Sequence, residues 1–167
     1  GMSFSFDVNY RAKLWSPEES SAGCHEFAKA AGLFFTPIRD AQTIYGVDGE
    51  PEKALAQLQE QYPQATVILT LGAEGAIGAE PGQPAIHQSV FPAGTVGRIG
   101  GGDAFTAGVL YGYLSETAAE NRLATALRWG AAAAAFKYTI PGDMPLFEKE
   151  EVASLLHSGN QAPQVRR

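Results

Sequence analysis

The segment GRIGGGDAFTAGVLYGYL, residues 97–114, places three consecutive glycines directly before an aspartate and an apolar stretch. Phe105, Val109 and Tyr113 recur at helical spacing, which predicts a helix that begins near Asp103. The amides of a first helical turn lack partners within the helix, and the helix macrodipole favours an anion at that end. Glycines let such amides close around a phosphate oxygen without a Cβ in the way. The segment therefore predicts an anion site at a helix N-terminus.

Asp103 stands at the mouth of this predicted helix, where its carboxylate is able to accept the proton of an attacking hydroxyl. Phosphoryl transfer has charge-spread transition states, which the amides of Gly100, Gly101 and Gly102 would stabilise. The alternative is structural, because Asp is a preferred N-cap residue and glycines often precede helices merely to turn the chain. The segment contains neither a P-loop nor a dinucleotide fingerprint, so the residues alone leave both interpretations open.

Composition excludes several classes of function. The 167 residues carry a formal net charge of −6, which argues against nucleic acid or an anionic membrane as the main partner. Cys24 is the only cysteine, so the chain has no internal disulfide and no thiolate metal cage, and its histidines lack ligand-like spacing. Because no apolar run reaches the roughly 20 residues of a membrane span and no signal-peptide pattern opens the chain, we expect a cytoplasmic protein.

Strand-like and helix-like segments alternate along the chain. A buried strand that runs out into a polar loop is predicted over residues 4–11, and further strands over residues 33–36, 65–80 (two strands and a turn) and 84–92. Helices are predicted over residues 16–32, 38–46, 51–63, 103–116, 120–139 and 148–158. This alternation predicts a mainly parallel sheet with helices on its faces. We expect residues 2–158 to form the fold and residues 159–167 a loose tail.

Residues 97–114 resemble the second signature of the ribokinase-like (PfkB-type) carbohydrate kinases, a G-A/G-G-D sequence followed by a helix. The triple glycine preceded by Arg98 looks most like the 2-keto-3-deoxygluconate kinase branch. Three other segments match the family in the same order: FSFDVNYRAKLWSPEE (sugar-acid side), VILTLGAEGA (nucleotide side) and ALRWGAAAAAFKYTIPGDMP (beside the adenine). The resemblance implies a three-layer α/β ribokinase-like fold with a mainly parallel sheet, of which this chain is the C-terminal, nucleotide-binding half.

The resemblance also implies a role for each matched residue: Asp103 as general base; Gly100, Gly101 and Gly102 as anion hole; Thr70, Gly72 and Gly75 lining the nucleotide; Asn9 and Arg11 facing the sugar acid and the phosphates; and Asp40 as a weak candidate for magnesium. The planar guanidinium of Arg11 suits a carboxylate because it binds one bidentately. The structural alternatives are a capped helix for Asp103, a hairpin turn for residues 72–75 and an ordinary polar surface for Asn9 and Arg11.

The sequence departs from the family pattern in three ways. The family's chains are longer than this one. Their N-terminal half, which includes the lid that covers the sugar, has no counterpart in this sequence, and a truncated chain would show the same absence. Gly97 replaces the acidic residue of a segment that helps bind an activating monovalent cation, so the match does not extend to that cation. In the family's Asn-x-x-Glu motif, which helps organise magnesium and phosphate, Pro37 and Asp40 stand in place of Asn and Glu.

The resemblance therefore predicts a kinase that uses ATP and Mg²⁺ to phosphorylate a sugar or a sugar acid such as 2-keto-3-deoxygluconate. The alternative is a non-catalytic remnant or accessory nucleotide-binding module that needs a partner chain. A truncated sheet would expose apolar surface and a strand edge, so we expect a homodimer or a complex with a chain that supplies the N-terminal half. A dinucleotide-dependent oxidoreductase is a third alternative, although the sequence lacks the fingerprint.

Overall fold

The computed structural model describes residues 4–158, and its contacts divide the chain into two compact units. The first unit extends to His87 and the second begins at Gln88. The predicted tail, residues 159–167, lies outside the described residues. Within residues 4–158, none of the helices combines the length and the apolar character that crossing a membrane requires.

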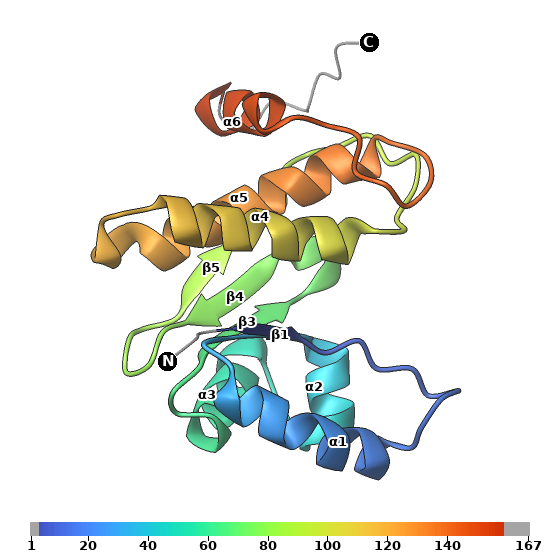
Figure 1. Ribbon diagram of the computed structural model, residues 1–167, viewed down its shortest axis with the longest axis vertical. Helices are drawn as coiled ribbons and strands as arrows, with labels where there is room; N and C mark the ends of the chain where they lie inside the picture. Colours follow the sequence, from blue (N-terminus) through green and yellow to red (C-terminus); the bar gives the residue numbers. More distant parts are fainter. Residues whose placement is uncertain (1–3, 159–167) are drawn as a thin grey trace. The chain divides into compact units, whose positions relative to one another are not determined.

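The first unit is built around a mainly parallel sheet, as predicted. Its elements are β1 (Ser5–Asp7), α1 (Pro17–Ala30), β2 (Leu33–Pro37), α2 (Ile38–Tyr45), α3 (Pro51–Gln61), β3 (Thr66–Thr70), the short 3₁₀ helix η1 (Gly72–Glu74) and β4 (Ala76–Ala79); β5 (Ile86–Gln88) follows. The sheet order is β1-β2-β3-β4-β5, with β1, β2 and β3 parallel and β4 antiparallel to β3. Helices α1, α2 and α3 all lie on one face of this sheet (Figure 1).

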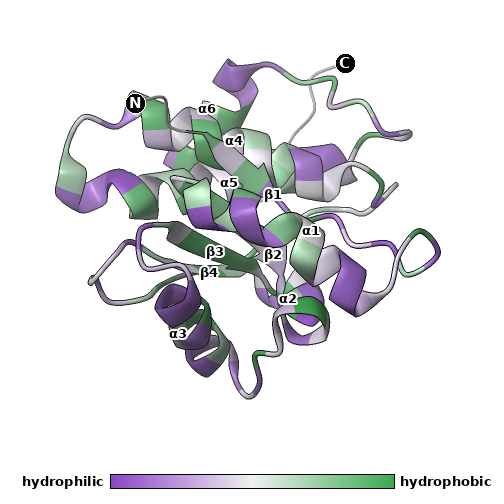
Figure 2. Cartoon of the chain, turned by 60° about the horizontal axis from the view of Figure 1, so that its bottom comes forward, coloured by the Kyte–Doolittle hydropathy of each residue, from purple (hydrophilic) through white to green (hydrophobic). Residues whose placement is uncertain are grey.

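Local sequence explains where α1 begins. Ser16 forms a capping box, in which its hydroxyl accepts from the Glu19 amide at 3.2 Å and the Glu19 carboxylate accepts from the Ser16 amide at 2.8 Å. Pro17 then occupies the first helical position, where its missing N–H costs nothing. The helix buries Cys24 and Ala28 against a core that also contains Phe34, Leu55, Leu58, Val67 and Ile77. Figure 2 shows the hydrophobic colouring of β3 and β4, which supply part of this core.

The regular structure of the second unit after β5 consists of helices, two of which are in close contact. It contains α4 (Gly101–Ser115), η2 (Ala119–Asn121), α5 (Arg122–Tyr138) and α6 (Lys149–Ser158). A Cβ on Gly108 of α4 would lie 2.6 Å from the Trp129 carbonyl oxygen, and one on Gly130 of α5 would lie 2.9 Å from the Phe105 carbonyl oxygen. The two helices therefore touch backbone to backbone, which only glycine permits at these positions.

Replacing Gly108 with Ala should lower the free energy of unfolding by about 1–3 kcal/mol, because the added methyl forces α4 and α5 apart. Urea denaturation followed by circular dichroism measures this loss. Gly94→Ala is the matched control, since a Cβ on Gly94 would meet nothing within 4 Å. Equal midpoints for the two variants would contradict the close helix contact.

Candidate functional site

Helix α4 begins at three consecutive glycines whose surroundings differ. Gly100 is the N-cap residue, with a left-handed φ of 78°, and a Cβ there would collide with the Asp143 carbonyl oxygen. Gly101 is buried, and a Cβ on it would collide with the Tyr138 ring. A Cβ on Gly102 would meet nothing within 4 Å. The fold therefore requires glycine at the first two positions, but nothing in the described chain requires it at the third.

Two amides at this helix start have no acceptor among the residues that the structure describes. The backbone N–H of Gly101 donates to the Arg98 carbonyl at 3.3 Å, and that of Ala104 donates to the Gly100 carbonyl at 2.9 Å. The N–H groups of Gly102 and Asp103, both exposed residues, donate to no atom of residues 4–158. Unpartnered amides at a helix N-terminus are the groups that bind phosphate oxygens in proteins.

The side chain of Asp103 lies in the first turn of α4 and is exposed. It makes no hydrogen bond or ion pair within residues 4–158, and no side chain caps the helix. The structural alternative, in which Asp103 is the N-cap, is therefore wrong, because Gly100 occupies that position. The carboxylate and the two free amides belong to the same helical turn, where the macrodipole favours negative charge.

The candidate site residues of the first unit lie at the carboxyl ends of the parallel strands. Asn9 and Arg11, both exposed, follow the carboxyl end of β1. Asp40 lies in the first turn of α2, directly after β2, and Thr70 ends β3. The register pairs Pro37 with Thr70, so these strand ends are neighbours. Open α/β sheets bind their ligands at the carboxyl ends of parallel strands.

Thr70, Gly72 and Gly75 belong to the turn that joins β3 to β4. Gly72 has a φ of 63° and Gly75 one of 101°, and the Leu71 amide donates to the Gly75 carbonyl at 2.8 Å. The antiparallel pairing of β3 and β4 makes this segment a hairpin turn, which accounts for both glycines. A Cβ on Gly72 would meet nothing within 4 Å, so its outer side is open. Nucleotide binding by this turn stays a prediction.

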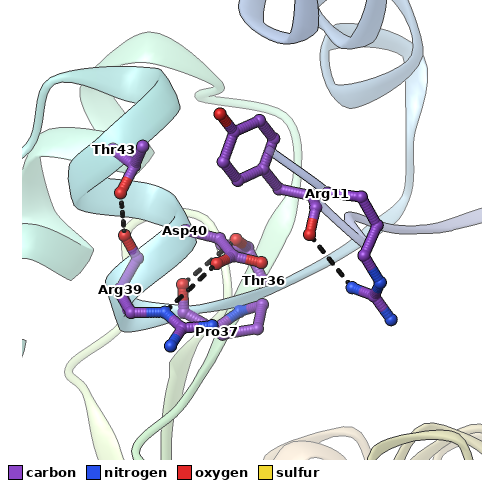
Figure 3. Close-up of polar contacts among 7 residues, drawn as sticks. Arg11, Thr36, Pro37, Arg39, Asp40 and Thr43 are labelled. Carbon is purple, nitrogen blue, oxygen red and sulfur yellow. Dashed lines mark hydrogen bonds and ion pairs between the residues drawn. The ribbon is translucent and has the colours of Figure 1, made fainter. Parts of the chain in front are cut away.

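Asp40 is a buried carboxyl group, only 5% exposed. Burial raises its pKa, and the nearby Arg39 guanidinium, a hydrogen bond from the Tyr10 backbone and the charge of Arg11 oppose that rise. Figure 3 shows Asp40 beside Arg39, whose Nε lies 3.7 Å from the carboxylate, with Arg11 on the neighbouring loop. Residues 4–158 contain no group of three or more His, Cys, Asp or Glu side chains suited to a metal ion. The magnesium role of Asp40 therefore stays a prediction.

Asp40→Asn should make the protein more stable at neutral pH. The folded state raises the pKa of Asp40 above its usual 3.8, so folding loses stability as the pH rises through that range, and the amide avoids this loss. Urea denaturation should show a higher midpoint for the variant at pH about 7 and no difference near pH about 3, where both forms are neutral. Asp48→Asn is the control with the opposite sign, because Lys53 lowers the pKa of that exposed carboxyl. A destabilised Asp40→Asn at neutral pH would contradict the argument.

The second unit contains an apolar cavity of about 260 Å³ lined by α4, α5, α6 and the segment that leads into α6. Tyr111 and Trp129 line it, with ring centroids 4.7 Å apart, together with Ala107, Ala133 and Phe147. Trp129 lies in the segment that the family resemblance places beside the adenine, whereas Tyr111 is not among the residues predicted for the site. Helical spacing could have placed Tyr111 in this cavity, because it lies on the same side of α4 as Ala104, Ala107 and Gly108.

These features define the class: an α/β protein with a parallel sheet whose strand ends carry polar side chains, and a separate glycine-rich helix start with free amides. The chain belongs to the pfkB family of carbohydrate kinases, whose family model matches residues 1–149. The family resemblance of the sequence is therefore confirmed.

Individual relatives agree with this assignment. The chain is 34% identical over 160 residues to the 2-dehydro-3-deoxygalactonokinase of Haloferax volcanii. The aligned region covers 96% of this chain and 49% of that protein. In structure it resembles the 2-dehydro-3-deoxygluconokinase of Thermotoga maritima, with a TM-score of 0.74 and 28% identity over 94% of this chain and 50% of the other. It also resembles a fructokinase double mutant from Vibrio cholerae bound to fructose, ADP and a potassium ion, with a TM-score of 0.72 and 28% identity over 84% and 45% of the two chains.

These likenesses confirm the predicted ribokinase-like fold, and the chain spans about half the length of the relatives it matches. The relatives named above are kinases, so they do not favour the alternative of a non-catalytic module.

Proposed function

We propose that this chain transfers the γ-phosphoryl group of ATP to a hydroxyl of a 2-keto-3-deoxy sugar acid. The observation that supports this most is the open space at Gly102. Because this residue has no side chain, the space lies beside two amides at the start of α4 that have no acceptor within residues 4–158. A phosphate oxygen fits that space, and the amides of Gly102 and Asp103 are its donors. The family assignment and the kinase names of the relatives point to the same chemistry.

In the proposed step, the acceptor hydroxyl oxygen bonds to the γ-phosphorus as the bond from that phosphorus to the ADP oxygen breaks. The Asp103 carboxylate takes the hydroxyl proton, and the amides of the same turn stabilise the charge on the phosphoryl oxygens. Mg²⁺ bound with ATP neutralises phosphate charge. Asp40 suits that ion as a single carboxylate, because Mg²⁺ at phosphates takes one or two carboxylates and keeps several waters.

Arg11 supports the choice of an acid rather than a neutral sugar. Its guanidinium is exposed on the loop after β1, and one of its nitrogens donates to the Tyr10 carbonyl at 3.0 Å. The remaining donors are available for the carboxylate of a sugar acid. The apolar cavity with Tyr111 and Trp129 suits a nucleobase, because aromatic side chains stack on bases.

An assay that couples ADP release to NADH oxidation tests the proposal with Mg-ATP and 2-keto-3-deoxygluconate. We expect ADP formation that depends on the sugar acid. Fructose is the matched neutral substrate, and a higher kcat/KM for fructose would overturn the assignment to acids but keep the kinase. ATP binding without any sugar-dependent ADP would overturn the kinase itself.

A further inference from the structure

Lys137 is a fully buried lysine in the last turn of α5, with 0% of its surface exposed. Its Nζ donates to the carbonyl oxygens of Ile140 at 3.1 Å and Gly142 at 2.8 Å. Within residues 4–158 it forms no ion pair with a carboxylate. Burying an ammonium group is costly unless polar groups surround it, so these carbonyls and the negative end of the α5 macrodipole balance the charge.

The turn that Lys137 holds rests against the start of α4. A Cβ on Gly100 would lie 3.2 Å from Cε of Lys137 and would collide with the Asp143 carbonyl. On the same side, the amides of Val96 and Gly97 donate to the Tyr138 carbonyl at 2.7 and 3.2 Å. The two hydrogen bonds of the Lys137 side chain therefore fix the turn of residues 138–143 on which the glycine-rich helix start is built.

The family resemblance places an activating monovalent cation at the segment that Gly97 opens, and the fructokinase relative was solved with potassium. Potassium is held in proteins by backbone carbonyl oxygens. The Ile140 carbonyl oxygen is the nearest atom to a Cβ on Gly97, at 3.6 Å, and it already accepts from Lys137. Gly97 has no side-chain oxygen to offer, so the residues present do not fit an exchangeable cation at these carbonyls.

We propose that the Lys137 ammonium is a built-in cation, a positioning residue that holds the turn of residues 138–143 against the N-terminus of α4 in place of an exchangeable potassium ion. The expectation that potassium does not change the affinity for Mg-ATP rests on the proposed function. The expectation that Lys137 stabilises the turn of residues 138–143 does not.

The wild-type protein gives the first test, by comparing potassium chloride with tetramethylammonium chloride at equal ionic strength. We expect thermal midpoints within about 1 °C of each other and dissociation constants for Mg-ATP within about twofold, because the carbonyls of Ile140 and Gly142 already accept from Lys137. A tenfold or greater tightening of Mg-ATP by potassium, or a clear rise in the midpoint, would overturn the proposal.

Lys137→Ala gives the second test, because it opens a space lined by the freed carbonyls of Ile140 and Gly142. In tetramethylammonium chloride its midpoint should fall by about 10 °C, and potassium or ammonium chloride should restore part of that loss. Lys137→Met fills the space without charge and should not respond to either salt. Lys29→Ala, at an exposed lysine in the last turn of α1, should leave the midpoint unchanged.

Equal midpoints of Lys137→Ala in all three salts would overturn the proposal. If Lys137→Ala does not fold, the salt comparison on the wild-type protein still tests whether Lys137 replaces a potassium ion. If the wild type binds no Mg-ATP, the proposed function fails, while the midpoints continue to test Lys137.

Discussion

Replacing Asp103 with Asn is expected to lower the rate of phosphoryl transfer by about 10²–10⁴-fold, the usual contribution of a general base. The amide keeps the size of the side chain but does not accept the hydroxyl proton. Because the Asp103 side chain is exposed and makes no hydrogen bond within residues 4–158, the free energy of unfolding should fall by at most the helix-dipole contribution, about 0.3–1 kcal/mol, and Mg-ATP should still bind. The coupled assay measures the rate, and calorimetry measures the binding.

Glu120→Gln is the matched control for this prediction. Glu120 is also an exposed acidic residue of the second unit, in η2 rather than in α4, so its replacement should leave the rate unchanged. An Asp103→Asn variant that retains more than half of the wild-type rate would show that the proton leaves by another route. If both variants lose the same fraction of the rate, the effect comes from the net charge of the second unit and not from a general base at Asp103.

Gly102→Ala should separate phosphate binding from stability. A Cβ at this position meets nothing within 4 Å, and φ is not left-handed, so the change should stabilise the fold by about 0.4–1 kcal/mol through the unfolded state. The same methyl would occupy the space proposed for a phosphate oxygen. Losing one charge-assisted hydrogen bond of about 1.5–3 kcal/mol should weaken Mg-ATP at least tenfold. Calorimetric titration and urea denaturation measure the two effects on the same preparation.

Gly101→Ala is the contrasting variant, because its Cβ would collide with the Tyr138 ring. It should lose stability, whereas Gly102→Ala should gain it. If Gly102→Ala binds Mg-ATP as tightly as the wild type, the open space at residue 102 is not the phosphate site. If both variants lose stability equally, the distinction between the two glycines is wrong.

Local sequence signals were enough to predict most of the fold. Ser16 and Pro17 marked the start of α1 because a capping box and an N1 proline act within one turn. Strand ends were less predictable, since pairing with a neighbour sets them: the strand predicted over residues 4–11 is β1, Ser5–Asp7, and the one over residues 84–92 is β5, Ile86–Gln88.

The details of the site depended on contacts between residues far apart in the sequence. Gly100 and Gly101 look alike in sequence, but Asp143 and Tyr138 decide why each must be glycine. In the sequence, Lys137 is an ordinary last-turn lysine, and only the packing of the turn that follows α5 buries it. An N-cap role for Asp103 was compatible with the sequence, because Asp is a preferred cap, but the structure places Gly100 at that position.

The most direct test of the central claim is a ¹H–¹⁵N NMR titration of the wild-type protein with Mg-ATP. We expect the amide resonances of Gly102 and Asp103 to shift in a saturable way, because these two N–H groups donate to no acceptor within residues 4–158 and are therefore open to a phosphate oxygen. Saturable shifts elsewhere in the chain, with the resonances of Gly102 and Asp103 unmoved, would contradict it.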